Sequence, residues 1–301
     1  MARSIVLALG GGGVKGIAHL GVVACLLDHD YEIHGIAGTS AGGMFGAPLA
    51  AKVSPRVIFE QVVPFMKKPD FSRASADGAS IAGTHGLENA LAPFIQGKLI
   101  EDLPIKFVAT AASLLTGKEV IIDSGEAIDA VLATIAIPGV FPARGENVLV
   151  DGGVLDPVPI LPARALNPLL PIVAVALNEK SPDAAPESEV LAMGDPITER
   201  ILERLGRTKI GETLDIVTRG LTLGMDKLTQ LSIETGQPDV IVRPLVGQHF
   251  ALSMIDPQEL FDEGYRAMKE QLDVLEKACS MLSSIKRAAK YYKADQAEVG
   301  G

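Results

Sequence analysis

The chain has 301 residues, a length that suits one large α/β domain with an ample apolar core. Its formal net charge of −10 argues against a nucleic-acid surface and against broad adhesion to anionic lipid, so any contact with a bilayer should be local and apolar. Apolar residues make up 48% of the chain, as strands buried on both faces of a parallel sheet require, and tryptophan is absent, which leaves little aromatic surface for stacking on bases.

A glycine-rich loop follows the first predicted strand. The apolar run 5–9 predicts a buried strand, residues 17–23 begin a helix, and residues 10–16 between them read Gly-Gly-Gly-Gly-Val-Lys-Gly. This spacing fits a dinucleotide-binding loop, but the second strand ends in Gly-Thr-Ser at 38–40, where that fold needs a carboxylate for the ribose. We therefore favour an oxyanion hole formed by the backbone N–H groups around Gly11, Gly12 and Gly13. A purely structural tight turn is the alternative.

The second strand leads into a candidate nucleophile. Residues 33–37 predict a strand, residues 41–47 turn helical, and the sequence Gly-Thr-Ser-Ala-Gly at 38–42 lies between them. A serine between small residues on a sharp strand-to-helix turn exposes its hydroxyl for attack on an acyl group. Such matches are common by chance, but the flanking strand and helix favour Ser40 as a nucleophile over an inert turn.

A third motif supplies a carboxylate. Residues 148–154 read Val-Leu-Val-Asp-Gly-Gly-Val, so a short strand carries Asp151 to its carboxyl end. In an open α/β sheet these strand ends border the ligand crevice, and we expect Asp151 to meet Ser40 there. Taken alone, the Asp-Gly-Gly sequence would indicate only a turn.

In this order the three motifs resemble the patatin-like phospholipases, in particular the bacterial members and the esterase domain of neuropathy target esterase. The resemblance covers about residues 4–180 and includes the intervening segments 103–110, 116–119 and 136–142. It implies a three-layer α/β/α fold with a mainly parallel central sheet. It also implies hydrolysis of lipid acyl esters, such as phospholipids or lysophospholipids, by a Ser40–Asp151 dyad without histidine, calcium or another cofactor.

The resemblance extends to the residues that support these motifs, with two departures. The supporting positions are Lys15, Gly16, Gly38, Gly42, Gly152 and Gly153. Lys15 stands where arginine is commoner in the family, and Asp156 follows the third motif where an asparagine pair is frequent. Neither departure touches the dyad, but Asp156 affects the wall of the expected site.

Two alternatives to a catalytic dyad remain open. His249 follows a predicted strand, so a Ser40–Asp151–His249 triad is formally possible, although a nucleophile as early as position 40 is unusual for that arrangement. A non-catalytic regulatory member of the same fold is the other alternative, and the intact Ser40 and Asp151 argue against it. The histidines show no metal-ligand spacing, and we expect no metal site.

The rest of the chain predicts one continuous domain. Residues 4–180 form the catalytic core. Residues 181–301 continue it with a Pro/Ala-rich acidic linker at 181–189, helices including 197–231, one strand, a last helix from Asp256 to about Tyr292, and a frayed tail at 293–301. We expect residues 52–100 either to form a lid or acyl-chain wall, or simply to close the core.

The sequence also carries expectations about location and partners. We expect no targeting segment and no membrane helix, because the longest apolar window, 160–177, contains Arg164 and three prolines. Cys25 and Cys279 are isolated and expected to be reduced. These features favour a cytoplasmic protein that contacts membranes transiently at their surface, with a lipid or ester substrate and no nucleic-acid partner; the sequence leaves the oligomeric state open.

Overall fold

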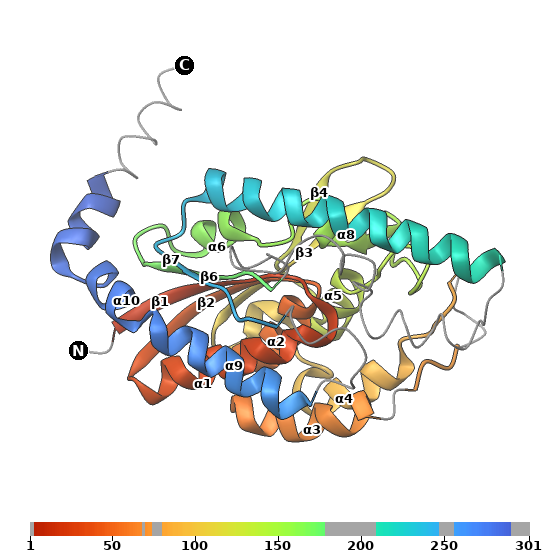
Figure 1. Cartoon of the computed structure of the whole chain (residues 1–301), viewed down its shortest axis with the longest axis horizontal. Coiled ribbons are helices and arrows are strands. Elements are labelled where there is room, and N and C mark those ends of the chain that lie inside the picture. The colour runs from red at the N-terminus through yellow and green to blue at the C-terminus, as the bar shows by residue number, and fades with distance from the viewer. Residues whose placement is uncertain (1–2, 68–69, 74–79, 178–208, 247–255, 290–301) are drawn as a thin grey trace, which may run out of the picture.

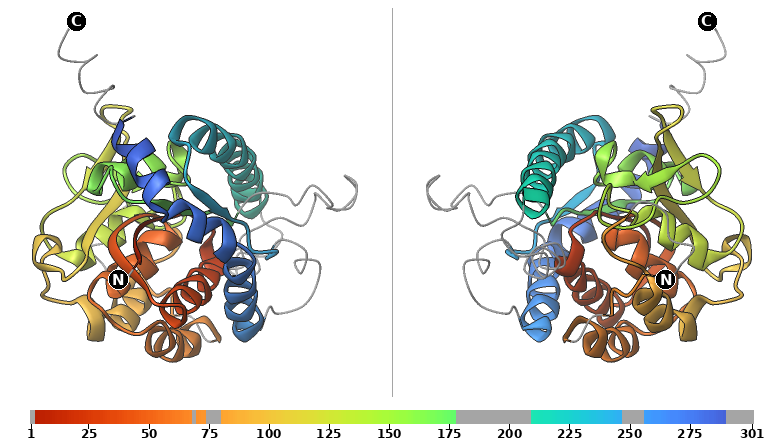
Figure 2. Two further views of the ribbon diagram at one scale, coloured as in Figure 1. Left: turned by 90° about the vertical axis from the view of Figure 1, so that its left-hand side faces the viewer. Right: turned by 90° about the vertical axis from the view of Figure 1, so that its right-hand side faces the viewer.

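The computed structural model describes residues 3–67, 70–73, 80–177, 209–246 and 256–289. A mostly parallel sheet lies between layers of helices, which confirms the predicted three-layer α/β/α architecture (Figures 1 and 2). None of the described helices is long and apolar enough to cross a bilayer.

The sheet follows the order β4-β3-β2-β1-β6-β7, and β5 pairs with β3 beside this path. Its strands are β1 (Arg3–Leu9), β2 (Tyr31–Thr39), β3 (Lys106–Ser113), β4 (Glu119–Ile122), β5 (Leu149–Asp151), β6 (Ile172–Val175) and β7 (Val240–Val242). Neighbours along β3, β2, β1, β6 and β7 are parallel, whereas β4 and β5 run antiparallel to β3. The last strand, β7, therefore belongs to the same sheet as the first.

Helices cover both faces of this sheet. They are α1 (Ile17–Asp28), α2 (Ala41–Ala50), α3 (Pro55–Lys67), α4 (His85–Ile95), α5 (Ala127–Thr134), α6 (Ile160–Leu166), α8 (Lys209–Gly236), α9 (Pro257–Glu270) and α10 (Leu272–Ala278), with short 3-10 turns η1 (Gly13–Gly16), η2 (Ile100–Asp102) and η3 (Gly152–Val154). In Figure 1, α1, α2, α3, α4 and α9 lie below the sheet, and α6 and α8 lie above it.

The alternation of side chains along β1 divides the core between the two layers. Ile5, Leu7 and Leu9 join the large apolar cluster formed with α1 to α5 and α9. Val6 and Ala8 face the other side and pack in a smaller cluster with residues of α6 and with Ile233 of α8. Because both faces are covered, the strands are apolar almost throughout, as parallel sheets require.

Near its carboxyl end, β3 pairs with both β2, which leads to Ser40, and β5, which ends at Asp151. Thr39, the last residue of β2, pairs with Thr110, and Asp151, the last residue of β5, pairs with Ala111. Since β4 occupies the other edge of β3 at these positions, β2 and β5 lie on the same edge and approach each other end to end. The register of a single strand thus brings the two motif residues together.

The prediction of one continuous last helix is wrong. Instead of one helix from Asp256 to Tyr292, the chain forms α9, breaks at Gln271, forms α10, and becomes helical again over residues 281–289. The break redirects the chain so that Leu275 becomes fully buried, which outweighs helix continuity. The Asp256 cap and Pro257 in the first turn do start α9 as predicted.

Phe65 and Met66 in α3 pack against the large apolar cluster, and Phe65 makes an edge contact with Phe71. For these side chains the structure favours the core-closing alternative over a lid. Several other expectations lie outside the described residues: the linker at 181–189, the tail at 293–301, His249, and the parts of the 52–100 segment at 68–69 and 74–79. The division into 4–180 and 181–301 stays a prediction.

Candidate active site

The structure brings Ser40 and Asp151 into direct contact. The Ser40 hydroxyl donates to Asp151 Oδ2 at 2.5 Å, and both residues are buried. The sequence predicts that they meet at the carboxyl ends of parallel strands, whereas Asp151 reaches Ser40 on the antiparallel strand β5. The contact leaves a nucleophilic oxygen beside a carboxylate that can accept its proton.

The backbone at Ser40 is strained. Its φ of 53° and ψ of −120° lie outside the regions that non-glycine residues favour. Two hydrogen bonds fix this turn: the Ser40 N–H donates to Thr134 Oγ1 at 2.8 Å, and the Ser40 carbonyl accepts from the Met44 N–H at 2.9 Å. The strained turn points the serine side chain away from its own helix and toward Asp151.

Three buried threonines connect this turn to the strands. Thr134 donates its hydroxyl proton to the Thr110 carbonyl at 2.6 Å, and Thr39 donates to the Asp156 carbonyl at 2.9 Å. The Thr39 hydroxyl is therefore free to accept from Thr110, whose oxygen lies 2.6 Å away. These threonines are not among the predicted site residues, and their only signal in the sequence is a polar residue within or at the end of each of three apolar segments.

The Asp151 carboxylate is held in place by its own loop. Its Oδ1 accepts from the Gly153 N–H at 2.7 Å, and the Asp151 N–H donates to the Ala136 carbonyl at 2.9 Å. One carboxylate oxygen is thus fixed by the Asp-Gly-Gly turn while the other faces Ser40. The glycine at 152 is needed for close approach, because a Cβ there would lie 2.5 Å from Thr110 Oγ1.

The glycine-rich loop lies beside the dyad. The Gly11 N–H donates to the Pro157 carbonyl at 2.9 Å, whereas no described residue accepts from the N–H groups of Gly12 and Gly13. Gly13 has a φ of 56°, and the N-terminus of the η1–α1 segment follows directly. Gly12 and Gly13 therefore present donors and a favourable helix dipole to an anion.

The remaining motif residues surround this loop and the start of α2. Gly16 packs against Ala41, and Gly38 packs against Gly42, so neither glycine leaves room for a side chain of its own. Gly42 also lies against the end of β1. Lys15 belongs to η1 and is partly buried, with its N–H donating to the Gly12 carbonyl at 3.1 Å. The predicted site residues thus lie together, at the Ser40–Asp151 contact, in the glycine-rich loop beside it and at the start of α2.

Comparison with known proteins decides the family. The model of the patatin-like phospholipase family matches residues 7–164, more than half of the chain. The chain belongs to the patatin-like phospholipase family. This confirms the resemblance predicted from its three motifs.

Relatives of this patatin-like chain include longer proteins. An uncharacterized NTE family protein of Mycobacterium bovis is 35% identical over 198 residues, which cover 62% of this chain and 52% of the relative. Lysophospholipase NTE1 of Mycosarcoma maydis is 28% identical over 190 residues, which cover 60% of this chain and 10% of the relative. The chain thus spans about half the length of this Mycobacterium bovis relative and a tenth of the fungal one.

Histidine takes no part in the described dyad of this patatin-like chain. His29 bonds to the Cys25 carbonyl, His34 pairs with Glu32, and His85 contacts Asn89. His19 is fully buried, its Nε2 lies 2.8 Å from the Gly10 carbonyl, and burial lowers the pKa of its ring to about 4. His19 is therefore neutral at pH 7 and donates from Nε2 to the glycine loop.

Asp156, the departure from the family pattern, links several parts of the site wall. Its Oδ1 accepts from the Ser232 hydroxyl of α8 at 2.8 Å, and its N–H donates to the Gly152 carbonyl at 2.9 Å. Burial raises the pKa of Asp156 to about 6. Burial, and secondly the Asp156 charge, raise the pKa of Glu119 on β4 to about 7. The two carboxyl groups therefore face each other across the edge of the sheet.

This carboxyl pair predicts a pH dependence of stability. Between pH 4 and 7 the folded state holds more protons on Asp156 and Glu119 than the unfolded chain does, so these groups lower stability as pH rises. We expect Glu119→Gln to raise Tm at pH 8 by roughly 1–2 °C, a small value because Glu119 is only partly shielded from solvent, and to leave Tm unchanged at pH 4. Thermal melts of Glu146→Gln, an exposed loop carboxyl, supply the charge-matched control. An equal shift at both pH values would contradict the pairing.

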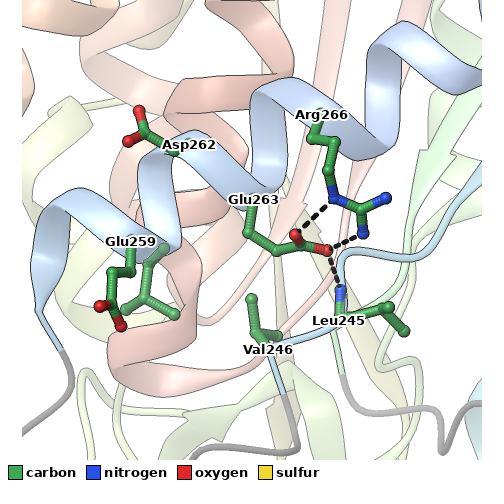
Figure 3. A pocket seen from close by; sticks show the side chains of 7 residues that line it. Leu245, Val246, Glu259, Asp262, Glu263 and Arg266 are labelled. Atoms are coloured by element: carbon green, nitrogen blue, oxygen red, sulfur yellow. Dashed lines mark hydrogen bonds and ion pairs between the residues drawn. The ribbon is translucent and has the colours of Figure 1, made fainter.

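A separate pocket of about 330 Å³ lies between the chain at Leu245–Val246 and α9 (Figure 3). Glu263 lies at its centre, accepting from the Leu245 N–H at 2.6 Å and pairing with Arg266. The pocket contains none of the motif residues, so it forms no part of the candidate active site. Within the described residues, no cluster of histidine, cysteine or acidic side chains could hold a metal ion.

Proposed function

We propose that this chain is a serine acyl hydrolase that cleaves carboxylic esters of lipids through a Ser40–Asp151 dyad and an acyl-enzyme. The contact of 2.5 Å between Ser40 Oγ and Asp151 Oδ2 carries the proposal. The strained backbone at Ser40 supports it, because strain of this kind persists where the surrounding structure enforces a functional geometry.

Asp151 acts as the general base in both halves of the reaction. Its Oδ2 takes the Ser40 proton as Oγ bonds to the ester carbonyl carbon, and it returns that proton to the alcohol when the ester C–O bond breaks. A water molecule then gives a proton to Asp151 and attacks the acyl-enzyme, which releases the carboxylic acid and restores the Ser40 hydroxyl. No histidine is needed, because the base is already hydrogen-bonded to the nucleophile.

The glycine loop stabilises the negative oxygen that forms in each step. We assign the donors to the N–H groups of Gly12 and Gly13, since the Gly11 N–H is already bonded to Pro157. One donor of this kind is typically worth roughly 3 kcal/mol of transition-state stabilisation. In this scheme Gly11 provides the close approach of the loop to Ser40, where a side chain would not fit well.

The substrate class rests on the family and its relatives. The matched family is that of the patatin-like phospholipases, and two fungal relatives are named lysophospholipases. We therefore propose phospholipids or lysophospholipids as substrates, reached by transient and local contact with a lipid surface. The acidic net charge is consistent with apolar rather than electrostatic contact.

A labelling experiment separates an enzyme from a non-catalytic member of the fold. An alkyl fluorophosphonate should modify Ser40 stoichiometrically, and the protein should release fatty acid from lysophosphatidylcholine equally well with and without EDTA. Mass spectrometry of the labelled peptide identifies the modified residue. A folded protein that neither reacts at Ser40 nor hydrolyses any ester in a panel of acyl lengths and head groups would be a regulatory member instead.

The same assay tests the triad alternative. His249→Gln should lower activity less than about tenfold, because loss of a general base typically costs 10²–10⁴-fold. A loss as large as that of Asp151→Asn would make His249 part of the catalytic group and would overturn the dyad mechanism.

A further inference from the structure

Helix α8 places a methionine directly against the candidate active site. The helix contacts α6 and η3, and it runs along one side of the molecule in Figures 1 and 2. Met225 is partly buried and extends from α8 toward the two glycine-containing loops that flank the dyad. Met225 has no part in the proposed proton transfers or in the oxyanion hole.

Two glycines locate the Met225 methyl group. A Cβ placed at Gly153 would lie 2.5 Å from Met225 Cε and 3.0 Å from Asp151 Oδ1. A Cβ placed at Gly11 would lie 3.6 Å from the same methyl and 3.3 Å from Ser40 Cβ. The methyl group therefore lies between the glycine loop and the Asp-Gly-Gly turn, beside both members of the dyad.

An ester on Ser40 has to share this space. Its carbonyl oxygen would point to the N–H groups of Gly12 and Gly13, so its acyl and alcohol groups extend from a carbon atom close to Gly11. Because the Met225 methyl group lies beside Gly11 and Gly153, one of these two groups has to pass it. Methionine is apolar and unbranched and adapts its shape to a ligand more readily than other apolar side chains do.

The part of α8 that follows Met225 is firmly attached. Ser232 donates to Asp156 Oδ1 at 2.8 Å, and Arg164 donates to the carbonyls of Gly236 and Gln237 at 3.0 and 2.8 Å. Gly236 itself packs on Ile160 so closely that a Cβ would lie 2.5 Å from that side chain. These contacts fix the register of the helix, and with it the position of Met225.

The turn before Met225 has much less support. Among the described atoms, none lies within 4 Å of a Cβ placed at Gly220 or Gly224, and Leu223 is 61% exposed. Glycine within a helix costs roughly 0.5–1 kcal/mol relative to alanine, so this turn is intrinsically weak. Met225 lies at the boundary between the attached and the weakly supported parts of α8.

We propose that Met225 forms the acyl-side wall of the active site and determines how long an acyl chain Ser40 accepts. The inference rests on the proposed ester hydrolysis and deepens it. Removing the side chain enlarges the apolar space beside Ser40, and a bulkier, rigid ring in its place fills that space. Both changes act on the acyl chain while leaving Ser40, Asp151 and the oxyanion donors intact.

Soluble esters of two acyl lengths test this assignment. The ratio of kcat/KM for p-nitrophenyl octanoate to that for p-nitrophenyl acetate should rise at least fivefold in Met225→Ala and fall at least fivefold in Met225→Phe. In both variants the change in this ratio should arise mainly from kcat/KM for the octanoate. Leu223→Ala, an exposed apolar change two residues away on the same helix, is the matched control and should keep the ratio within twofold.

Labelling rates with a short and a long alkyl fluorophosphonate provide a second measurement that does not depend on turnover, and they should change in the same directions. A ratio within twofold of wild type in both Met225 variants would overturn the assignment, as would proportional losses on both esters. Misfolding of both variants in circular dichroism would place Met225 in the core instead. If the wild-type protein neither hydrolyses esters nor labels at Ser40, the proposed function itself fails, which is a different result.

Discussion

Ser40→Ala is expected to abolish ester hydrolysis while leaving the protein folded. The change removes the oxygen that forms the acyl-enzyme, and losses of roughly 10⁴–10⁶-fold in kcat are typical when a nucleophile is removed from a group that acts as a unit. Alanine has the same Cβ, so the strained turn and its bonds to Thr134 and Met44 should persist. Steady-state kinetics and circular dichroism check both parts of the expectation.

Asp151→Asn should cost nearly as much by a different route. The amide can still hold the Gly153 N–H through its oxygen, but it cannot take the Ser40 proton. The double variant should lose no more activity than Ser40→Ala does, because Asp151 has no serine proton to accept once Ser40 is replaced. The control is Ser113→Ala, which removes a different buried serine, at the end of β3, and its kcat should stay within threefold of wild type. Near-normal turnover by folded Ser40→Ala would exclude the dyad.

Much of the fold was accessible from the sequence because both faces of the sheet are buried. Runs such as Ile5-Val6-Leu7-Ala8-Leu9 are continuous and apolar, and turn residues separate them from the helices. The three motifs lie at strand ends, so their residues could be placed in one region without coordinates. The structure adds the distance between Ser40 and Asp151 and the strain at the turn, which no local pattern contains.

Other features depend on contacts that are distant in sequence. The direction of β5 is set by the long connection from β4 to residue 149, and three residues are too few to indicate it. The helical spacing of α8 indicates a helix, but the face toward the site follows from its attachment to Asp156 and Arg164. The break at Gln271 likewise follows from burial of Leu275 and not from a helix-breaking residue.

Gly42→Ala is expected to disable the site from a position that touches no substrate. A Cβ at Gly42 would lie 1.9 Å from the Leu9 carbonyl oxygen and 2.9 Å from that of Gly10, and backbone cannot move aside as a flexible side chain can. Helix α2 must therefore shift away from β1 and carry Ser40 with it. A displacement of about 1 Å can cost 10²-fold in rate. The strain should lower Tm by roughly 5–10 °C.

The comparison with Gly46→Ala, one turn later in α2, separates this steric effect from the general effect of replacing a helical glycine. The nearest atoms to a Cβ at Gly46 would belong to side chains, those of Ile36 and Phe107 at 3.1 Å and that of Leu9 at 3.8 Å, and alanine gains helix propensity there. Gly46→Ala should therefore keep Tm within about 3 °C and activity within about threefold of wild type. Equal effects of the two variants would show that the approach of α2 to β1 is not what positions Ser40. A larger effect at Gly42 alone ties the geometry of the nucleophile to the close approach of the α2 backbone to the end of β1.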